Sequence, residues 1–450
     1  MNFTRIALLA AFVVAVTFAE APNAHSAEPA RTQLAFPGAE GFGRHSLGGR
    51  GGRAIFVTNL DDYNPKTKKT PPIEGSFRWA LAQPGPRTIV FRTSGVIKLV
   101  APLKITEPRV TIAGQTAPGD GICLTDYGTQ IEADDVVLRH VRFRPGDAVG
   151  KEAERAGRVP MSQRHHRPLL GIVERRRDLE RHRRRLRRRD RAVVLHHGEP
   201  RPKRACQRQT RLRLAHPNRR RRDLSPQSLR SSSHARCPRP GTYGKPPGLL
   251  LDFRHNVIYD WISPAGYTSD DPARINYVGN YLKPGPSTTE RAYMFNIGGP
   301  ATQIYAADNL LDFERMRTAG DWAWIEHAEP GNKLAAALEA APVAFENAET
   351  VCDRVPAEAG ATRPKRDAID LRIVEQFRTS GGRVINAPSE VGGLPTYTPT
   401  EPPADSDADG IPDAWETAHQ LNPQDPADAA ADRNSDGFTN LEEWLNELAA

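Results

Sequence analysis

The chain has 450 residues and a formal net charge of +8, and it is long enough for one large folded domain with an appendage. Its four cysteines exclude a disulfide-dense scaffold, and no CxxC spacing indicates zinc. The charge is uneven, because residues 155–230 hold 25 Arg and one Lys against six acidic residues, a local net of +20 that leaves −12 elsewhere.

The N-terminal residues 1–27 predict an export signal. Arg5 provides a positive start, residues 6–19 form an apolar core, and small residues follow, with cleavage expected after Ser26 or Ala27. The alternative is a retained membrane anchor, but the apolar run is short for a span and no later run reaches about 18 residues. We therefore expect a secreted protein, extracellular or periplasmic, with no membrane span once mature.

Short β-branched runs dominate residues 110–147, where Gly, Pro and Asp turns separate them. The runs are too short for ordinary helices and are typical of strands. Val110 and Val136 lie 26 residues apart, and Thr88, which opens an earlier run, lies 22 residues before Val110. A strand–turn–strand unit that recurs every 20–30 residues predicts a solenoid, in which each coil buries its inner face against the next.

Coil-like repeats return over residues 251–312. Asn256, Asn280 and Asn309 follow one another at spacings of 24 and 29 residues. An Asn in the tight turn of each coil tolerates left-handed backbone, and its amide can bond the turn of the next coil. We expect these residues to stack as a ladder; the alternative is a set of unrelated turn residues.

Helices are predicted outside the repeat or at its ends. Residues 75–83 are expected to form a short helix that caps the first coil, with Ser76 as its N-cap. Residues 326–342 and 364–378 are also predicted to be helical. Residues 391–404 are rich in Pro, Gly and Thr, which predicts a linker.

The Arg-rich stretch, residues 155–233, has no usable apolar period. A disordered arm and a nucleic-acid-binding patch are two interpretations, but aromatic residues for base stacking are absent and an exported protein rarely meets nucleic acid. We favour a third, translation out of frame, since a shifted frame of GC-rich DNA yields Arg, Pro and Ala. Reading a GC-rich back-translation of residues 164–178 one base later recovers VIIDHCSGSWSVDE. We therefore expect no nucleic-acid partner.

Several motifs together resemble the pectate lyase family, polysaccharide lyase family 1. They include AFPGAEGFG, GSFRWAL, VTIAGQTAPGDGI, VVLRHVRFRPGD and DFRHNVIYDW. The resemblance covers residues 35–154 and about 234–315, and the stretch 155–233 breaks it. It implies an all-β fold, a right-handed parallel β-helix over residues 28–390, with an irregular or disordered Arg-rich insert. VIIDHCSGSWSVDE looks like the next coil of this family.

The resemblance also implies a calcium-dependent monomer that cleaves pectin or polygalacturonate by β-elimination. Calcium then bridges an acidic site and the sugar carboxylate, an Arg takes the C5 proton, and the C4 oxygen leaves. Arg236 in HARCPRPG matches the family's base, Arg239 is the candidate for holding a substrate carboxylate, and Glu152 and Glu154 match its paired acidic residues. Arg can act as a base only where nearby cations disfavour its charged form.

Two alternatives stay open. Arg236 could simply be a salt-bridging or solvated residue beside a turn. The protein could also be a non-catalytic exported carbohydrate-binding or surface protein on the same scaffold. Because the family's remaining calcium carboxylates and substrate Lys would fall within residues 155–233, we expect little or no lyase activity from the chain as written.

Residues 405–450 contain two acidic loops that fit the twelve-position calcium pattern D-x-[DN]-x-[DN]-G-x5-E. The predicted side-chain ligands are Asp405, Asp407, Asp409, Asp413 and Glu416 in the first loop and Asp432, Asn434, Asp436, Asn440 and Glu443 in the second. A Gly permits the sharp turn, and the seventh residue (Ile411, Phe438) offers its carbonyl. This EF-hand-like pair resembles thrombospondin type 3 or dockerin-like calcium repeats; the alternative is an acidic disordered tail.

Overall fold

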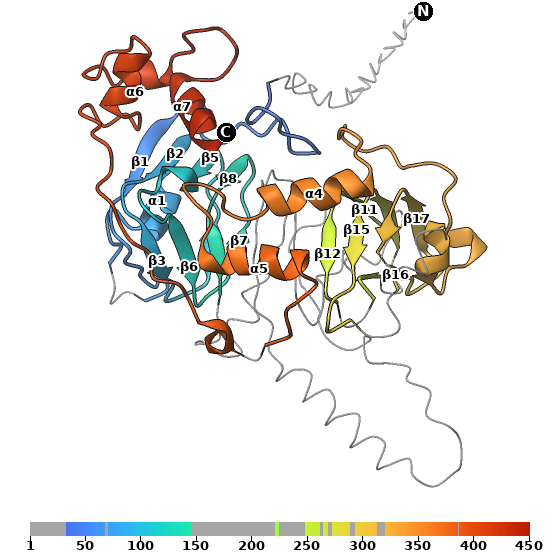
Figure 1. Ribbon diagram of the computed structural model, residues 1–450. Coiled ribbons are helices and arrows are strands. Elements are labelled where there is room, and N and C mark those ends of the chain that lie inside the picture. The colour runs from blue at the N-terminus through green and yellow to red at the C-terminus, as the bar shows by residue number, and fades with distance from the viewer. Residues whose placement is uncertain are drawn as a thin grey trace, which may run out of the picture. The chain divides into compact units, whose positions relative to one another are not determined.

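A computed structural model describes residues 33–67, 71–145, 221–224, 248–261, 264–268, 272–288, 293–312, 320–385 and 387–450 (Figure 1). Within them, Gln33–Ala450 group as one compact unit. The predicted signal segment lies outside the described residues, and so does most of the Arg-rich stretch. None of the helices formed by the described residues is long and apolar enough to cross a membrane.

The first coils, residues 53–144, form three parallel sheets. One sheet contains β1 (Arg53–Val57), β2 (Arg87–Phe91), β5 (Val110–Ala113) and β8 (Val136–Arg139). The second contains β3 (Gly95–Lys98), β6 (Ile122–Thr125) and β9 (Arg142–Arg144), and the third contains β4 (Leu103–Ile105) and β7 (Thr129–Ile131). Val110 pairs with Val136 in register, as their spacing predicts. The predicted parallel β-helix is confirmed.

The later coils, residues 249–334, repeat the arrangement. Their first sheet contains β10 (Arg221–Leu224), β11 (Leu249–Arg254), β14 (Ala273–Val278) and β17 (Thr302–Ala307). The second sheet contains β12 (Val257–Tyr259), β15 (Tyr281–Lys283) and β18 (Leu310–Leu311). The third contains β13 (Gly266–Tyr267), β16 (Phe295–Asn296) and β19 (Ile325–Glu326). Strand β10 belongs to the stretch predicted to be irregular. It pairs in parallel with β11, from Arg221 beside Leu250 to Leu224 beside Phe253, through backbone hydrogen bonds that any extended segment can make at a sheet edge.

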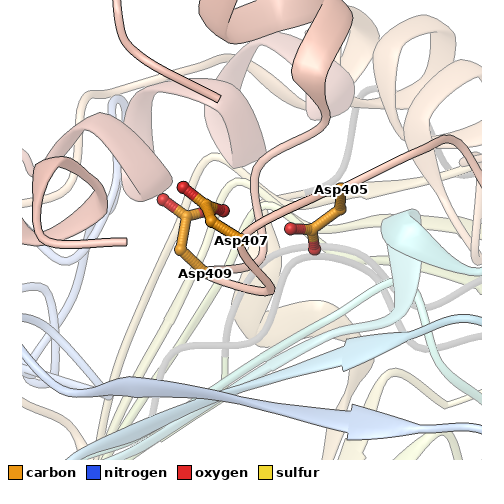
Figure 2. A group of neighbouring side chains, drawn as sticks. All are labelled: Asp405, Asp407 and Asp409. Atoms are coloured by element: carbon orange, nitrogen blue, oxygen red, sulfur yellow. The ribbon is translucent and has the colours of Figure 1, made fainter. Parts of the chain in front are cut away.

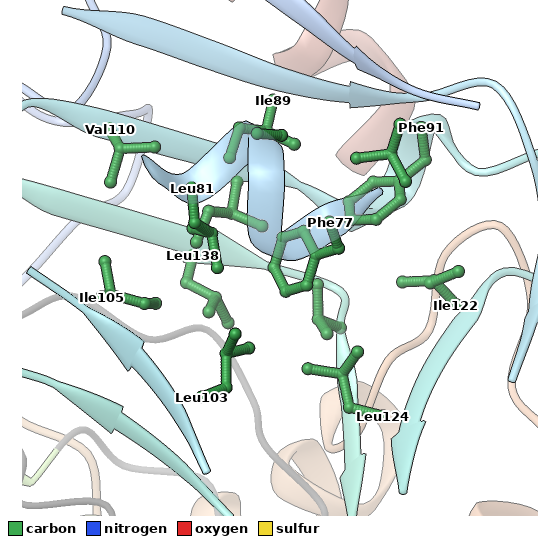
Figure 3. Close-up of a cluster of buried hydrophobic side chains, with 14 of the residues drawn as sticks. Phe77, Leu81, Ile89, Phe91, Leu103, Ile105, Val110, Ile122, Leu124 and Leu138 are labelled. Carbon is green, nitrogen blue, oxygen red and sulfur yellow. The ribbon is translucent and has the colours of Figure 1, made fainter. Parts of the chain in front are cut away.

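The interior of the first coils is apolar, because inward-facing positions of successive strands stack on one another (Figure 3). Ile89, Val110 and Ile112 are fully buried there. Helix α1 (Phe77–Ala82) adds Phe77 to the same cluster. The Ser76 side chain accepts a hydrogen bond from the Trp79 backbone N–H at 3.3 Å, which confirms both the predicted helix and its N-cap.

The asparagine ladder of the later coils is confirmed. The Asn280 Oδ1 atom accepts hydrogen bonds from the backbone N–H of Asn256 at 3.0 Å and from its Nδ2 at 2.9 Å. Asn309 Oδ1 accepts from Asn280 in the same way, at 3.0 and 2.8 Å. The left-handed backbone falls one residue earlier than predicted, at His255 (φ 57°) and Gly279 (φ 61°), because the strand ends before the Asn.

The prediction of a helix at 326–342 was wrong. After the 3₁₀ turn η3 (Pro330–Asn332) this segment extends and joins the edge of the last coil. Asn332 Nδ2 donates to the Thr302 carbonyl at 2.8 Å, and the Leu334 N–H donates to the Ile304 carbonyl at 2.9 Å. These backbone partners on the neighbouring coil outweigh the helix propensity of the Ala-rich run.

Two helices pack on the later coils. Helix α4 (Ala348–Glu358) was not predicted, and α5 (Ala368–Arg378) falls inside the predicted range 364–378. Val351 of α4 and Phe377 of α5 share a buried cluster with Tyr259 and Tyr281 of strands β12 and β15. The helices therefore cover an outer face of the coils.

The C-terminal module, residues 405–450, follows the turn η4 (Pro388–Val391) and the predicted linker at 391–404, which has neither helix nor strand beyond that turn. The segment is anchored, since the Thr398 N–H donates to Asp120 Oδ2 at 2.9 Å. The module holds α6 (Asp413–Ala418), the turn η5 (Asp428–Ala430) and α7 (Asn440–Ala449).

Candidate metal centre

The residues predicted to carry the lyase chemistry, Glu152, Glu154, Arg236 and Arg239, all lie outside the described residues. Their catalytic and calcium-binding roles therefore stay predictions. Between residue 145, just after β9, and residue 248, just before β11, the structure describes only β10 (Arg221–Leu224).

The first loop of the C-terminal module brings three predicted ligands together. Carboxylate oxygens of Asp405, Asp407 and Asp409 lie within 4.8 Å of one another (Figure 2). Gly410 turns the loop with a φ of 101°, which L side chains rarely adopt, as the calcium pattern predicts. The Gly410 N–H donates to Asp405 Oδ2 at 3.3 Å, and the Ile411 N–H donates to Asp409 Oδ1 at 2.7 Å.

A second group shares Asp409 and adds Glu416, on α6, and Asp428, the first residue of η5. Oxygens of these three residues also lie within 4.8 Å of one another. Glu416 is 0% exposed, and neither of its carboxylate oxygens has a hydrogen-bond partner among the described residues. The sequence pattern did not indicate Asp428, because it lies between the two loops and belongs to neither twelve-residue repeat.

The carboxylates of this centre are electrostatically unfavourable without a cation. Burial and repulsion from Asp407 raise the pKa of Asp409 to about 7, and burial and repulsion from Asp409 raise the pKa of Glu416 to about 7. Within the described part of the chain, both oxygens of Asp407 and of Glu416 and one each of Asp405, Asp409 and Asp428 are buried without a hydrogen-bond donor. Unsatisfied buried acceptors are costly, and calcium takes six to eight oxygen ligands, so this donor set fits calcium.

Two predicted ligands of the loops have other partners. The Asp413 carboxylate accepts from the backbone N–H and the hydroxyl of Ser406, both at 2.7 Å. Asn440 is fully buried; its Nδ2 donates to the Asp428 carbonyl at 2.8 Å, and its Oδ1 accepts from the Arg433 N–H at 3.4 Å. Asp413 lies outside the carboxylate clusters, and the role of both residues as ligands stays a prediction.

The second loop gathers Asp432, Asp436 and Glu443 within 4.8 Å, and Gly437 turns it with a φ of 91°. Asn434 Oδ1 accepts the Asp436 N–H at 3.1 Å. Asp432 and Asp436 are exposed, unlike their counterparts in the first loop. The two loops thus share a pattern but differ in burial.

The fold and the acidic clusters together define the class of this protein: a parallel β-helix that is followed by two acidic loops. No family model matches the chain. It is 30% identical over 449 residues to a probable pectate lyase C of Aspergillus flavus, covering 92% of this chain and 94% of that protein. It is also 30% identical over 452 residues to one of Aspergillus fumigatus, with the same coverage. The chain belongs to the pectate lyase family.

Two further similarities are more limited. A putative pectate lyase of Arabidopsis thaliana is 36% identical over 118 residues, which is 25% of this chain and 26% of that protein. The crystal structure of the major cedar pollen allergen covers 72% of this chain and 92% of its own, with a TM-score of 0.41 and 13% identity.

Proposed function

We propose that this protein is a secreted, calcium-dependent lyase that cleaves polygalacturonate by β-elimination. One observation carries the proposal: relatives named probable pectate lyases match 94% of their own length at 30% identity. A β-helix alone supports no particular reaction, so the family relation is required for this step.

The proposed roles follow the family motifs. Glu152 and Glu154 would hold the cation, and Arg239 would bind a substrate carboxylate. Calcium, when bound, would withdraw charge from the sugar carboxylate and so acidify the C5 proton. Arg236 would accept that proton, which requires cationic surroundings because the pKa of Arg is ordinarily above about 12.

The chain as written is expected to have little or no activity, because residues 155–233 depart from the family pattern. Reading the gene across codons 150–240 shows whether a neighbouring frame encodes VIIDHC-like sequence. The chain as written and a version with the frame restored would then be incubated with polygalacturonate, with calcium or with a chelator. Absorbance of the unsaturated product reports cleavage.

The restored chain is expected to release product only with calcium. Strong calcium-dependent release by the chain as written would overturn the expected inactivity, and the absence of VIIDHC-like sequence from both neighbouring frames would overturn the frame proposal. No release by either chain would overturn the lyase proposal. The alternative function, a non-catalytic carbohydrate-binding or surface protein, is favoured by the Arg-rich stretch. It predicts retention on pectin without product from either chain.

The proposal extends to the C-terminal module, in which each acidic loop would bind one calcium ion. The two carboxylate clusters, with Gly410 and Gly437 at the turns, support it. Calorimetric titration of the calcium-free chain should show two sites beyond any in the β-helix, and variants in each loop should remove one site each.

A further inference from the structure

The first loop of the module packs directly on the first coils. Ile411, at position seven of the loop, is fully buried in a cluster with Ala113, the last residue of β5. Leu441 and Trp444 of α7 complete this cluster. Position seven of such a loop offers its backbone carbonyl to the cation. Ile411 would therefore contact the cation through its carbonyl while its side chain packs in this cluster.

Polar contacts reinforce the packing. Arg92, which follows β2, lies 3.1 Å from Asp405 Oδ2, while the other oxygen of Asp405 is buried and has no partner within the described ranges. Arg50 donates to both oxygens of Glu442 at 2.9 Å. The Gln115 side chain donates to the Leu445 carbonyl at 3.2 Å. Asp405 is thus shared between an arginine of the coils and the carboxylate cluster.

We propose that one divalent cation, held by Asp405, Asp407, Asp409, Glu416 and Asp428, fastens the C-terminal module to the first coils of the β-helix. Asp428 is a ligand from outside the loop repeat. The inference rests on the calcium loops proposed above and not on the lyase activity. The Glu416 carboxylate, which is fully buried and has no hydrogen-bond donor among the residues that the structure describes, separates this cluster from an ordinary acidic surface.

The coupling follows from geometry. Without a cation, five carboxylates crowd a site where, among the described residues, several of their oxygens are buried without a hydrogen-bond donor. The loop can relieve this repulsion by opening, and opening displaces Gly410 and Ile411 from their positions against the coils. A Cβ at Gly410 would lie only 2.9 Å from the Ala54 Cβ, so the loop backbone touches β1 closely. A bound cation therefore favours the docked module.

Calcium titration of the purified chain tests the ligand set. Glu416→Gln and Asp428→Asn should each weaken one site at least about tenfold, because each removes a charged ligand. Asp413→Asn should change affinity much less, since that carboxylate bonds Ser406 instead. Asp436→Asn, in the exposed second loop, is the matched control that should weaken only the other site.

Thermal unfolding and amide hydrogen exchange test the fastening. Calcium at about 100 times its dissociation constant should raise the unfolding midpoint by about 3 °C for a chain of this size. It should also slow exchange over residues 110–116. Ile411→Ala keeps the backbone carbonyl but removes the side chain that packs on Ala113, so it should lose most of this protection and, because docking and binding are coupled, also weaken calcium binding at the first loop. Asp436→Asn should keep the protection.

The outcomes separate the two proposals. If the chain binds no calcium at the module, both the calcium loops and the fastening are wrong. If calcium binds but exchange at 110–116 is the same with calcium and with chelator, only the fastening is wrong. If Asp428→Asn binds two module ions with unchanged affinity, Asp428 is not a ligand.

Discussion

Replacing Asn280 by Ala removes the middle of the asparagine ladder. Asn280 is fully buried, and its side chain makes four hydrogen bonds. Its Oδ1 accepts from the N–H and the Nδ2 of Asn256, and its Nδ2 donates to the Phe253 carbonyl at 3.2 Å and to Asn309 Oδ1 at 2.8 Å. The substitution leaves two buried donors of Asn256 unpaired.

An unpaired buried donor costs about 1–3 kcal/mol, so the free energy of unfolding should fall by roughly 2–6 kcal/mol. Urea denaturation followed by circular dichroism measures it. Asn309→Ala is the internal comparison, because Asn309 ends the ladder and is only half-buried, so that water can reach the two donors of Asn280 that lose its Oδ1. A loss below about 1 kcal/mol for Asn280→Ala, or one no larger than for Asn309→Ala, would refute the stacking argument.

Two further predictions concern buried charge. Arg144 is paired at 2.6 Å with Asp370, which is 0% exposed, so Arg144→Leu should lower the free energy of unfolding, measured by urea denaturation, by about 3–5 kcal/mol. Lys104 forms an exposed ion pair, and Lys104→Leu should lower it by less than about 1 kcal/mol. Equal losses for the two variants would contradict this. Burial lowers the pKa of His255, so its contribution to stability is complete above its ordinary value of 6.5 and falls as pH drops toward the lowered pKa. His255→Asn should therefore lose less stability between pH 7 and pH 5 than the wild type in thermal unfolding, and an identical loss would refute the assignment.

The coils could be predicted because their signal is periodic. Val110 and Val136 lie 26 residues apart in the sequence and pair with each other in the sheet. The spacings of Asn256, Asn280 and Asn309 likewise predicted the ladder that these residues form. Residues 326–342 carry no such periodic signal, and their conformation was predicted wrongly as a helix. Their Ala-rich composition favours a helix locally, but the edge of the last coil supplies backbone partners that sequence alone does not show.

The clustering of acidic side chains in the first loop could be predicted in part, and their role as metal ligands stays a prediction. The loop pattern specifies Asp405, Asp407, Asp409 and Glu416, and the structure places them in two carboxylate clusters that share Asp409. Asp428 was missed because a tertiary contact, not the repeat, brings it there. The pattern also cannot show that Asp413 turns to Ser406, because that choice of side-chain rotamer depends on the neighbouring loop backbone.

Helix α5 contacts coils that are far apart in the sequence. Its N-cap Asp367 accepts from Arg144 of β9 at 3.0 Å, and its Phe377 packs against Tyr259 of β12. The helix thus packs on both sets of coils, so side-chain contacts as well as the intervening polypeptide join β9 to the later strands.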